Sequence, residues 1–185
     1  MNIFVNLAGY QAIWFLCVLF GNSGAVAGLF LVVLHLLLTD KRIADAKVIM
    51  GFVAAGVIID TAMQYFSVLA FDPPSRLIPF WLVIIWAGLA TLPLHSLRWM
   101  QGRHLINIVF GGVGGPLAYW GGVQLGGAEF PQSVAYSLAV LALVWAVFWP
   151  AAMLFVSRVY GPGHHCGREK QKDRIHDDVH SLKGD

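Results

Sequence analysis

The chain has 185 residues, of which 58% are apolar, 13% are aromatic and only 12% are charged, with a formal net charge of +2. Its mean hydropathy is +0.69. This composition excludes an ordinary soluble domain, because a soluble protein of this size carries far more charged surface. We therefore expect an all-α integral membrane protein.

Six apolar runs are long enough to be membrane helices, since the bilayer core is about 30 Å thick and requires about 20 residues per helix. In chain order they cover residues 3–20, 23–38, 47–70, 77–97, 105–125 and 131–158. The first two are separated only by the turn-rich stretch Gly21-Asn22-Ser23-Gly24, which predicts a tight helical hairpin. The sequence thus predicts a bundle of six transmembrane helices over residues 1–160.

The basic residues lie almost entirely on one side of this predicted bundle. Only Arg76 lies on the other side; eleven of the twelve lie on the side that holds both termini: Lys41, Arg42, Lys47, Arg98, Arg103, Arg158, Arg168, Lys170, Lys172, Arg174 and Lys183. Because Lys and Arg are retained in cytoplasmic loops, we expect both termini in the cytoplasm. Membrane topology alone explains why the basic residues lie on one side, so they do not indicate nucleic-acid binding.

Residues 161–185 form a polar segment that is rich in histidine. We expect a flexible cytoplasmic tail, because so few apolar residues cannot offset the entropy of ordering. His176 and His180 lie one helical turn apart and are weak candidates for metal ligands, although zinc sites usually show two closely spaced ligand pairs. Cys17 and Cys166 are not expected to form a disulfide in a reducing compartment.

Asp60 lies in the middle of the third run, where a charged side chain costs about 3 kcal/mol to insert. It belongs to one helix face with residues at intervals of four, four and three: Gly56, Asp60, Gln64 and Ser67. Tyr119 is expected at a similar depth, and Gln11 is also within reach. Two interpretations stay open, a hydrogen-bonded clamp between helices and a proton or ligand site.

His35 and His95 are expected about one turn from the cytoplasmic ends of the second and fourth runs, about 10 Å or more from Asp60. A direct pair with Asp60 is therefore not expected. The two histidines share a depth and, with Arg98 and Arg103 nearby, could form a cytoplasm-facing site for a metal, a proton or an anionic head group. The alternative is that each histidine only caps a helix end.

The fifth run carries a stripe of small residues on one face: Gly111, Gly115, Ala118, Gly122 and Gly126. Such a stripe favours close helix packing, with the lining of a substrate path as the alternative. A phosphate-binding loop is excluded, since no strand precedes these glycines and no Lys-Ser/Thr pair follows. The packing partner can belong to the same chain or to another, so the oligomeric state stays open.

His95-Ser96-Leu97-Arg98-Trp99, followed by the Gly-Gly-Pro-Leu-Ala-Tyr core of residues 114–119, resembles a family of small bacterial inner-membrane proteins that is classed as a domain of unknown function. The resemblance covers about residues 11–159. It implies no activity. It does imply a multi-pass location in the bacterial cytoplasmic membrane and, through gene neighbourhood, fatty-acid-modifying enzymes such as cyclopropane fatty-acid synthase as partners.

The first functional hypothesis is a lipid-linked accessory or small-molecule carrier protein. In this hypothesis the interior residues Asp60, Gln64 and Tyr119 bind a polar group, while Arg98 faces anionic lipid head groups. Membrane lipids are then its main partners. The sequence identifies no cofactor.

The second hypothesis is a membrane enzyme that uses His35 and His95 at the cytoplasmic interface, with or without a metal. It requires an acid at the same depth, and Asp40 and Asp45 in the adjoining loop are the only nearby candidates. A structural scaffold, in which the polar residues only hold the helices together, is the alternative to both hypotheses.

Overall fold

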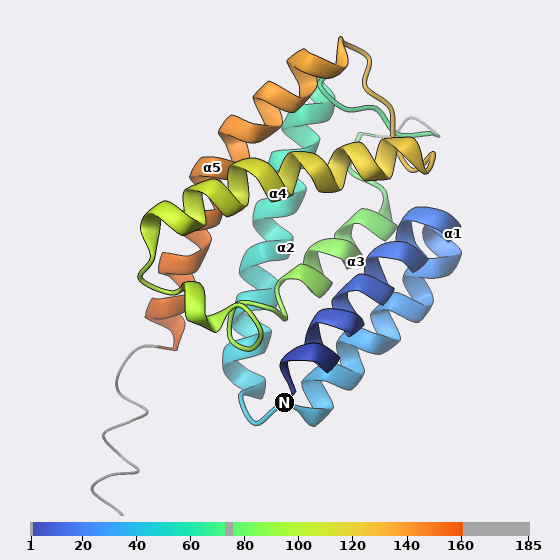
Figure 1. Ribbon diagram of the computed structural model, residues 1–185. Helices are drawn as coiled ribbons and strands as arrows, with labels where there is room; N and C mark the ends of the chain where they lie inside the picture. Colours follow the sequence, from blue (N-terminus) through green and yellow to red (C-terminus); the bar gives the residue numbers. More distant parts are fainter. Residues whose placement is uncertain (1, 73–75, 161–185) are drawn as a thin grey trace, which may run out of the picture.

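The computed structural model describes residues 2–72 and 76–160, which form an all-helical protein (Figure 1). The helices in chain order are α1 (Ile3–Leu38), α2 (Arg42–Tyr65), α3 (Phe80–Leu89), the 3-10 helix η1 (Arg98–Met100), α4 (His104–Gln124) and α5 (Val134–Val159). Three of them, α1, α2 and α5, are long and apolar enough to cross a membrane, and α3 is a shorter apolar helix.

Helix α1 reverses direction at Gly21, so that its two arms run side by side (Figure 1). Gly21 has φ 56° and ψ −133°, a conformation that is open to glycine because it has no Cβ. A Cβ on Gly24 would lie 1.9 Å from the carbonyl oxygen of Leu16, and one on Gly28 would lie 3.3 Å from Cys17 Sγ. The reversal falls in the stretch where the sequence predicts a hairpin.

The helix predicted over residues 77–97 is much shorter in the structure, because α3 ends at Leu89. The chain then continues through turns to η1. Pro93 has no backbone N–H to donate within a helix. Thr91 also turns its hydroxyl back to the backbone, since Oγ1 donates to the Gly88 carbonyl at 2.8 Å. Residues 90–97 therefore form an irregular segment instead of the second half of a long helix.

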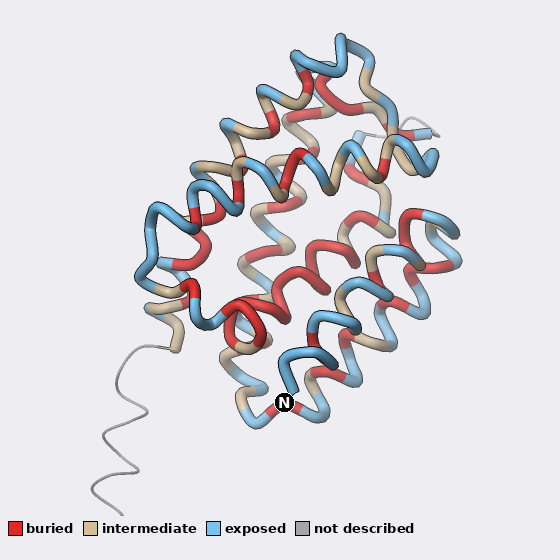
Figure 2. The backbone as a smooth tube through the Cα atoms, in the orientation of Figure 1, coloured by how far each residue is buried: buried red, intermediate tan, exposed pale blue. Residues whose placement is uncertain are grey.

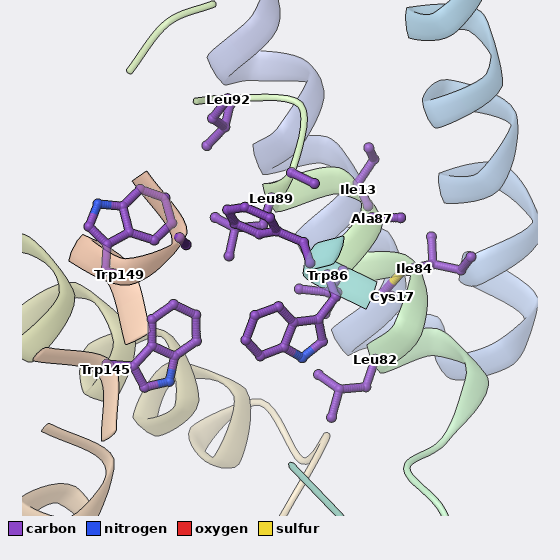
Figure 3. Packing of buried hydrophobic residues seen from close by; sticks show 14 of the residues in the cluster. Ile13, Cys17, Leu82, Ile84, Trp86, Ala87, Leu89, Leu92, Trp145 and Trp149 are labelled. Carbon is purple, nitrogen blue, oxygen red and sulfur yellow. The ribbon is translucent and has the colours of Figure 1, made fainter. Parts of the chain in front are cut away.

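The core is built around α3, which is buried along most of its length (Figure 2). Trp86 of α3 stacks on Trp145 of α5 with ring centroids 5.2 Å apart and planes 14° from parallel (Figure 3). Glycines provide the room for both indoles: a Cβ on Gly56 would lie 2.2 Å from Trp86 Cδ2, and one on Gly115 would lie 2.3 Å from Trp145 Cγ. The tryptophan pair thus joins α2, α3, α4 and α5.

Contacts near the chain reversals define two ends of the molecule. At the Gly21 end, the Trp81 backbone N–H donates to Asn22 Oδ1 at 3.2 Å, and Ala70 pairs with Glu129 in an isolated β-bridge. At the opposite end, Lys41 Nζ donates to the Leu94 carbonyl at 3.1 Å. The chain from Trp81 to Leu94 therefore runs from one end to the other, although only part of it is helical.

The outer surface of the helices carries many large apolar side chains. Large aliphatic side chains on separate helices are about 70% exposed: Leu38 of α1 at 69%, Ile58 of α2 at 71% and Val147 of α5 at 72%. A soluble monomer does not present apolar surface on this scale. Together with the three long apolar helices, this surface indicates a membrane protein.

Candidate functional sites

The first polar centre is the fully buried carboxylate of Asp60 on α2. Trp86 Nε1 of α3 donates to Asp60 Oδ2 at 2.6 Å, and the Tyr119 hydroxyl of α4 donates to Oδ1 at 2.5 Å. Each carboxylate oxygen thus has a donor from a different helix. Such an arrangement compensates part of the cost of burying the carboxylate. It acts as a clamp between α2, α3 and α4.

The other residues that the sequence predicts near Asp60 do not belong to this clamp. Gln64 is half-buried near the end of α2, which stops at Tyr65. Ser67 lies beyond that end with φ 55° and is therefore not on the helix face. Gln11 is exposed on α1 and lines a cavity between α1 and α4, so it is not a hydrogen-bond partner of Asp60.

That cavity, named here the α1–α4 cavity, has a volume of about 370 Å³. Its walls include Tyr10, Gln11, Trp14, Leu89, Gly114, Leu117, Ala118, Trp145 and Trp149. A smaller apolar cavity, which shares Tyr10, Trp14, Leu89 and Trp145, contains Tyr119 in its wall. Leu117 is 57% exposed, so the α1–α4 cavity extends to the outer, apolar surface of the helices. Its chemistry suits an apolar ligand.

The small-residue stripe of α4 divides between two neighbours. Gly111 and Gly115 lie against α5, where a Cβ would come within 2.3 Å of Trp145 at either position. Ala118 lines both cavities. A Cβ on Gly122 would meet no atom within 4 Å, and this residue lines the smaller cavity. Gly111 and Gly115 also line the α1–α4 cavity, whereas Gly126 lies beyond the end of α4 at Gln124 and has φ 81°. The stripe from Gly111 to Gly122 therefore packs on α5 and borders apolar space, and Gly126 is not part of this helix face.

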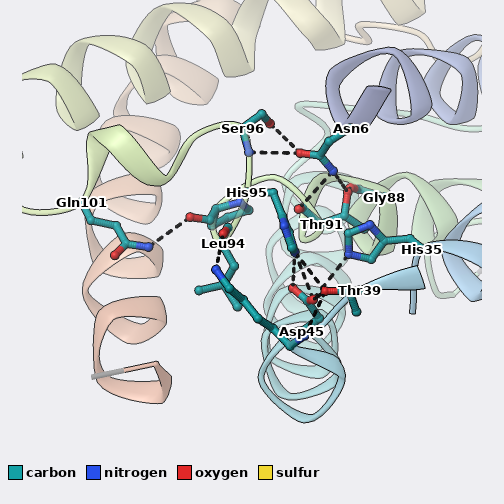
Figure 4. A network of polar contacts seen from close by, with 12 residues as sticks. Asn6, His35, Thr39, Asp45, Gly88, Thr91, Leu94, His95, Ser96 and Gln101 are labelled. Carbon is teal, nitrogen blue, oxygen red and sulfur yellow. Dashed lines mark hydrogen bonds and ion pairs between the residues drawn. The ribbon is translucent and has the colours of Figure 1, made fainter. Parts of the chain in front are cut away.

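The second polar centre joins the end of α1 and the start of α2 to the segment that follows α3 (Figure 4). His35 in the last turn of α1, Asp45 in the first turn of α2 and His95 after α3 place one ligand atom each within 4.8 Å of one another. His95 Nε2 lies 3.0 Å from Asp45 Oδ2, and His35 Nε2 lies 3.6 Å from the same oxygen. We call these residues the His-Asp-His cluster.

Neighbouring hydrogen bonds hold this cluster in place (Figure 4). The Thr39 hydroxyl donates to Asp45 Oδ2 at 2.6 Å. Ser96, next to His95, donates from its backbone N–H and its hydroxyl to Asn6 Oδ1 at 3.2 and 2.6 Å. Asn6 Nδ2 in turn donates to Thr91. These contacts fix the irregular segment that carries His95 against α1.

A polar cavity of about 190 Å³ adjoins the cluster and is lined by Thr39, Asp40, Lys41, Leu94, His95 and Arg98. Lys41 Nζ lies 4.4 Å from the centroid of the Tyr160 ring, and the Arg98 guanidinium lies 5.6 Å from it. The predicted ligand-binding residue Arg98 is therefore next to His95 and far along the chain from Asp60. The predicted metal candidates His176 and His180 lie outside the described residues.

Two important residues were underestimated from the sequence. The apolar pattern predicts that Asp45 lies in a loop, but α2 begins at Arg42 and buries Asp45 completely. A signal was present, since Asp45, Val48, Phe52, Gly56 and Asp60 follow one helix face at intervals of three and four. Trp86 was not expected as a partner of Asp60, because nothing in the sequence specifies which helix packs beside α2.

A family model described as "Protein of unknown function (DUF2878)" matches residues 3–151. The chain belongs to the DUF2878 family. The match includes Asp60, Tyr119 and all three residues of the His-Asp-His cluster, so both polar centres lie within the DUF2878 region. No curated protein and no solved structure shows significant similarity to the chain.

Proposed function

We propose that this DUF2878 protein is a six-span protein of the bacterial cytoplasmic membrane that binds the apolar chain of a membrane lipid in the α1–α4 cavity. The observation that carries the proposal is the cavity itself: its walls are aromatic and aliphatic, and it reaches an outer surface that is also apolar. Its volume of about 370 Å³ lies within the roughly 300–1,000 Å³ of ligand pockets.

Six crossings are supported by the way the segments connect the two ends. The two arms of α1 meet at Gly21, and the chain from Trp81 to Leu94 joins the ends even though α3 has only ten residues. Helix α4 has 21 residues, which corresponds to about 31 Å of length. The two arms of α1, helix α2, the chain from Trp81 to Leu94, helix α4 and helix α5 together make six crossings.

The distribution of charge supports cytoplasmic termini. Lys41, Arg98 and Tyr160 lie together at one end, and Arg76 belongs to the loop at the other end. Since Lys and Arg mark the cytoplasmic side, the Lys41 end faces the cytoplasm. The apolar cavity then lies within the membrane, and the polar cavity with Lys41 and Arg98 lies at the cytoplasmic level of anionic head groups.

Asp60 takes a supporting role in this proposal. Both of its oxygens already accept hydrogen bonds from Trp86 and Tyr119, and these two side chains line the smaller cavity. Asp60 therefore positions the cavity wall and does not bind the lipid head group. This role departs from the expectation that Asp60, Gln64 and Tyr119 bind a polar ligand directly.

The test is native mass spectrometry of the protein purified in a mild detergent, with identification of the lipids that remain bound. Gly114 lines the cavity, and a Cβ there would meet no atom within 4 Å, so Gly114→Leu places a larger side chain in the cavity without a clash at its Cβ. Val113→Phe adds bulk at the adjacent position, which is 54% exposed, and is the matched control.

We expect wild type and Val113→Phe to retain phospholipid and Gly114→Leu to retain at least about ten-fold less, which corresponds to about 1.4 kcal/mol of binding free energy. Circular dichroism checks that all three proteins remain helical. If wild type retains no lipid, or if Gly114→Leu retains as much as wild type, the lipid-binding function is wrong and the scaffold interpretation stands.

A membrane enzyme with a cytoplasm-facing histidine site is the second candidate function. The observation in its favour is Asp45, which supplies the acid that this hypothesis requires directly beside His35 and His95. Turnover of a lipid by the purified protein that is lost in His95→Ala would favour the enzyme over the lipid carrier.

A further inference from the structure

We propose that the His-Asp-His cluster binds one divalent first-row transition-metal ion, through an imidazole nitrogen of His35, an imidazole nitrogen of His95 and the carboxylate of Asp45. This proposal goes beyond lipid binding and does not depend on it, because the cluster shares no residue with the α1–α4 cavity. Zn²⁺ fits the donor set of two imidazoles and one carboxylate.

The spacing of the donor atoms fits a metal after a small contraction. Zinc bonds to nitrogen and oxygen ligands are about 2.0–2.2 Å long, so ligands in a tetrahedral site lie about 3.3 Å from each other. Asp45 Oδ2 lies 3.0 Å from His95 Nε2 and 3.6 Å from His35 Nε2. All three ligand atoms lie within 4.8 Å of one another, so movements of the imidazoles by about one ångström complete the geometry.

Burial and hydrogen bonding distinguish this cluster from a surface group of polar residues. The side chains of His35 and His95 are each 8% exposed, and that of Asp45 is 0% exposed. Within the described part of the chain, the buried His35 Nε2 faces Asp45 Oδ2 at 3.6 Å, which is longer than an ordinary hydrogen bond. A buried donor or acceptor without a hydrogen bond is costly. A metal ion between the rings would bind this nitrogen directly.

The surroundings of the cluster also resemble those of metal ligands. The Thr39 hydroxyl donates to Asp45 Oδ2 at 2.6 Å and so orients the carboxylate, as the partners of metal ligands commonly do. The rings of His35 and His95 are held edge to face, with centroids 5.0 Å apart and planes at 88°. Three separate chain segments therefore present preoriented donors to one point.

The adjoining polar cavity leaves room for a further ligand. It borders His95 and carries Lys41 and Arg98, whose charges lie over the Tyr160 ring, together with Asp40. A site with three protein ligands keeps one position for water or another small ligand. The two cations make an anionic oxygen ligand, such as that of phosphate, the preferred occupant of that position.

The experiment measures metal binding by the full-length protein, purified in detergent without a histidine tag. Zn²⁺ content is determined after dialysis, and Co²⁺ is titrated as a spectroscopic probe of coordination. The cluster variants are His95→Ala and Asp45→Asn, the second of which preserves the shape of the side chain. The controls are His104→Ala, at an exposed histidine of α4, and the double variant His176→Ala/His180→Ala, which tests binding by the tail.

We expect about one Zn²⁺ per chain for wild type and both controls, and at least 100-fold weaker binding for the two cluster variants. Thr39→Val should weaken binding 10–100-fold, as expected for a partner of a metal ligand. Zn²⁺ should also raise the Tm of wild type but not that of Asp45→Asn, and a cooperative thermal transition of Asp45→Asn without Zn²⁺ shows that this variant is folded.

Wild type that binds no Zn²⁺ or Co²⁺, or metal binding that survives in Asp45→Asn and His95→Ala, would overturn the proposal. Loss of binding only in the His176→Ala/His180→Ala variant would assign the metal to the tail and also overturn it. Lipid retention is measured on the same Asp45→Asn sample. Because the cavity and the cluster are separate, a failure of metal binding leaves the lipid result unchanged.

Discussion

Trp86 Nε1 donates a hydrogen bond of 2.6 Å to Asp60 Oδ2, which ties the central helix α3 to α2 in the middle of the protein. Both residues are buried, and the indole is enclosed between Gly56 and Trp145. This hydrogen bond therefore links the one acidic group at the centre of α2 to the packing of the aromatic core.

Replacing Trp86 by Phe should lower the free energy of unfolding by about 1–3 kcal/mol, because Asp60 Oδ2 loses its donor while it stays buried. Reversible unfolding by sodium dodecyl sulfate measures the change. Trp120→Phe is the control, since Trp120 is 43% exposed on α4 and should change stability by less than about 0.5 kcal/mol. Equal effects at the two positions would show that the Asp60 hydrogen bond contributes nothing.

Gly56→Ala and Gly115→Ala should each destabilise the protein by about 1–3 kcal/mol through overpacking. The new methyl groups would lie 2.2 Å from Trp86 Cδ2 and 2.3 Å from Trp145 Cγ, so the stacked indoles must move apart. Gly114→Ala is the control in the same helix as Gly115, because nothing lies within 4 Å of its Cβ. Thermal unfolding followed by tryptophan fluorescence reports both stability and the packing of the indoles. A Gly115→Ala protein as stable as Gly114→Ala would contradict the packing described here.

The proposed orientation predicts opposite labelling of two exposed loop positions. In a background with Cys17→Ala and Cys166→Ser, Asp72→Cys should react with a membrane-impermeant maleimide on intact cells. Asp40→Cys should react only after the membrane is permeabilised, because it lies at the Lys41 end. The reverse pattern would place the Lys41 end outside the cytoplasm, and labelling of both positions on intact cells would contradict six crossings.

The length of the apolar runs predicted most of the helices, because a long apolar segment has few alternatives in a membrane. The predicted runs 105–125 and 131–158 correspond closely to α4 (His104–Gln124) and α5 (Val134–Val159). The run 77–97 was wrong as a single helix. Apolar content alone does not reveal that Thr91 and Pro93 end the helical hydrogen bonding while the chain remains buried and continues in the same direction.

The polar centres were only partly predictable, because the partners of a buried polar group come from other segments. Depth along the helices placed Tyr119 near Asp60 and separated Asp60 from His35 and His95. The same reasoning could not identify Trp86 as a donor, since indoles also occur at membrane interfaces. Asp45 was assigned to a loop because the apolar run begins only after it, whereas α2 starts at Arg42. Because α2 starts before Asp45, the Asp45 carboxylate lies beside His35 and His95.

Photo-crosslinking to a phospholipid with a diazirine in its acyl chain tests the central claim, lipid binding in the α1–α4 cavity, most directly. The protein is reconstituted into vesicles that contain this lipid, and the crosslinked residues are mapped by mass spectrometry. We predict crosslinks at the cavity-lining residues Tyr10, Trp14 and Trp145, which decrease at least about ten-fold in Gly114→Leu and remain in Val113→Phe. Crosslinks confined to outward-facing residues such as Val147, with no effect of Gly114→Leu, would contradict the account.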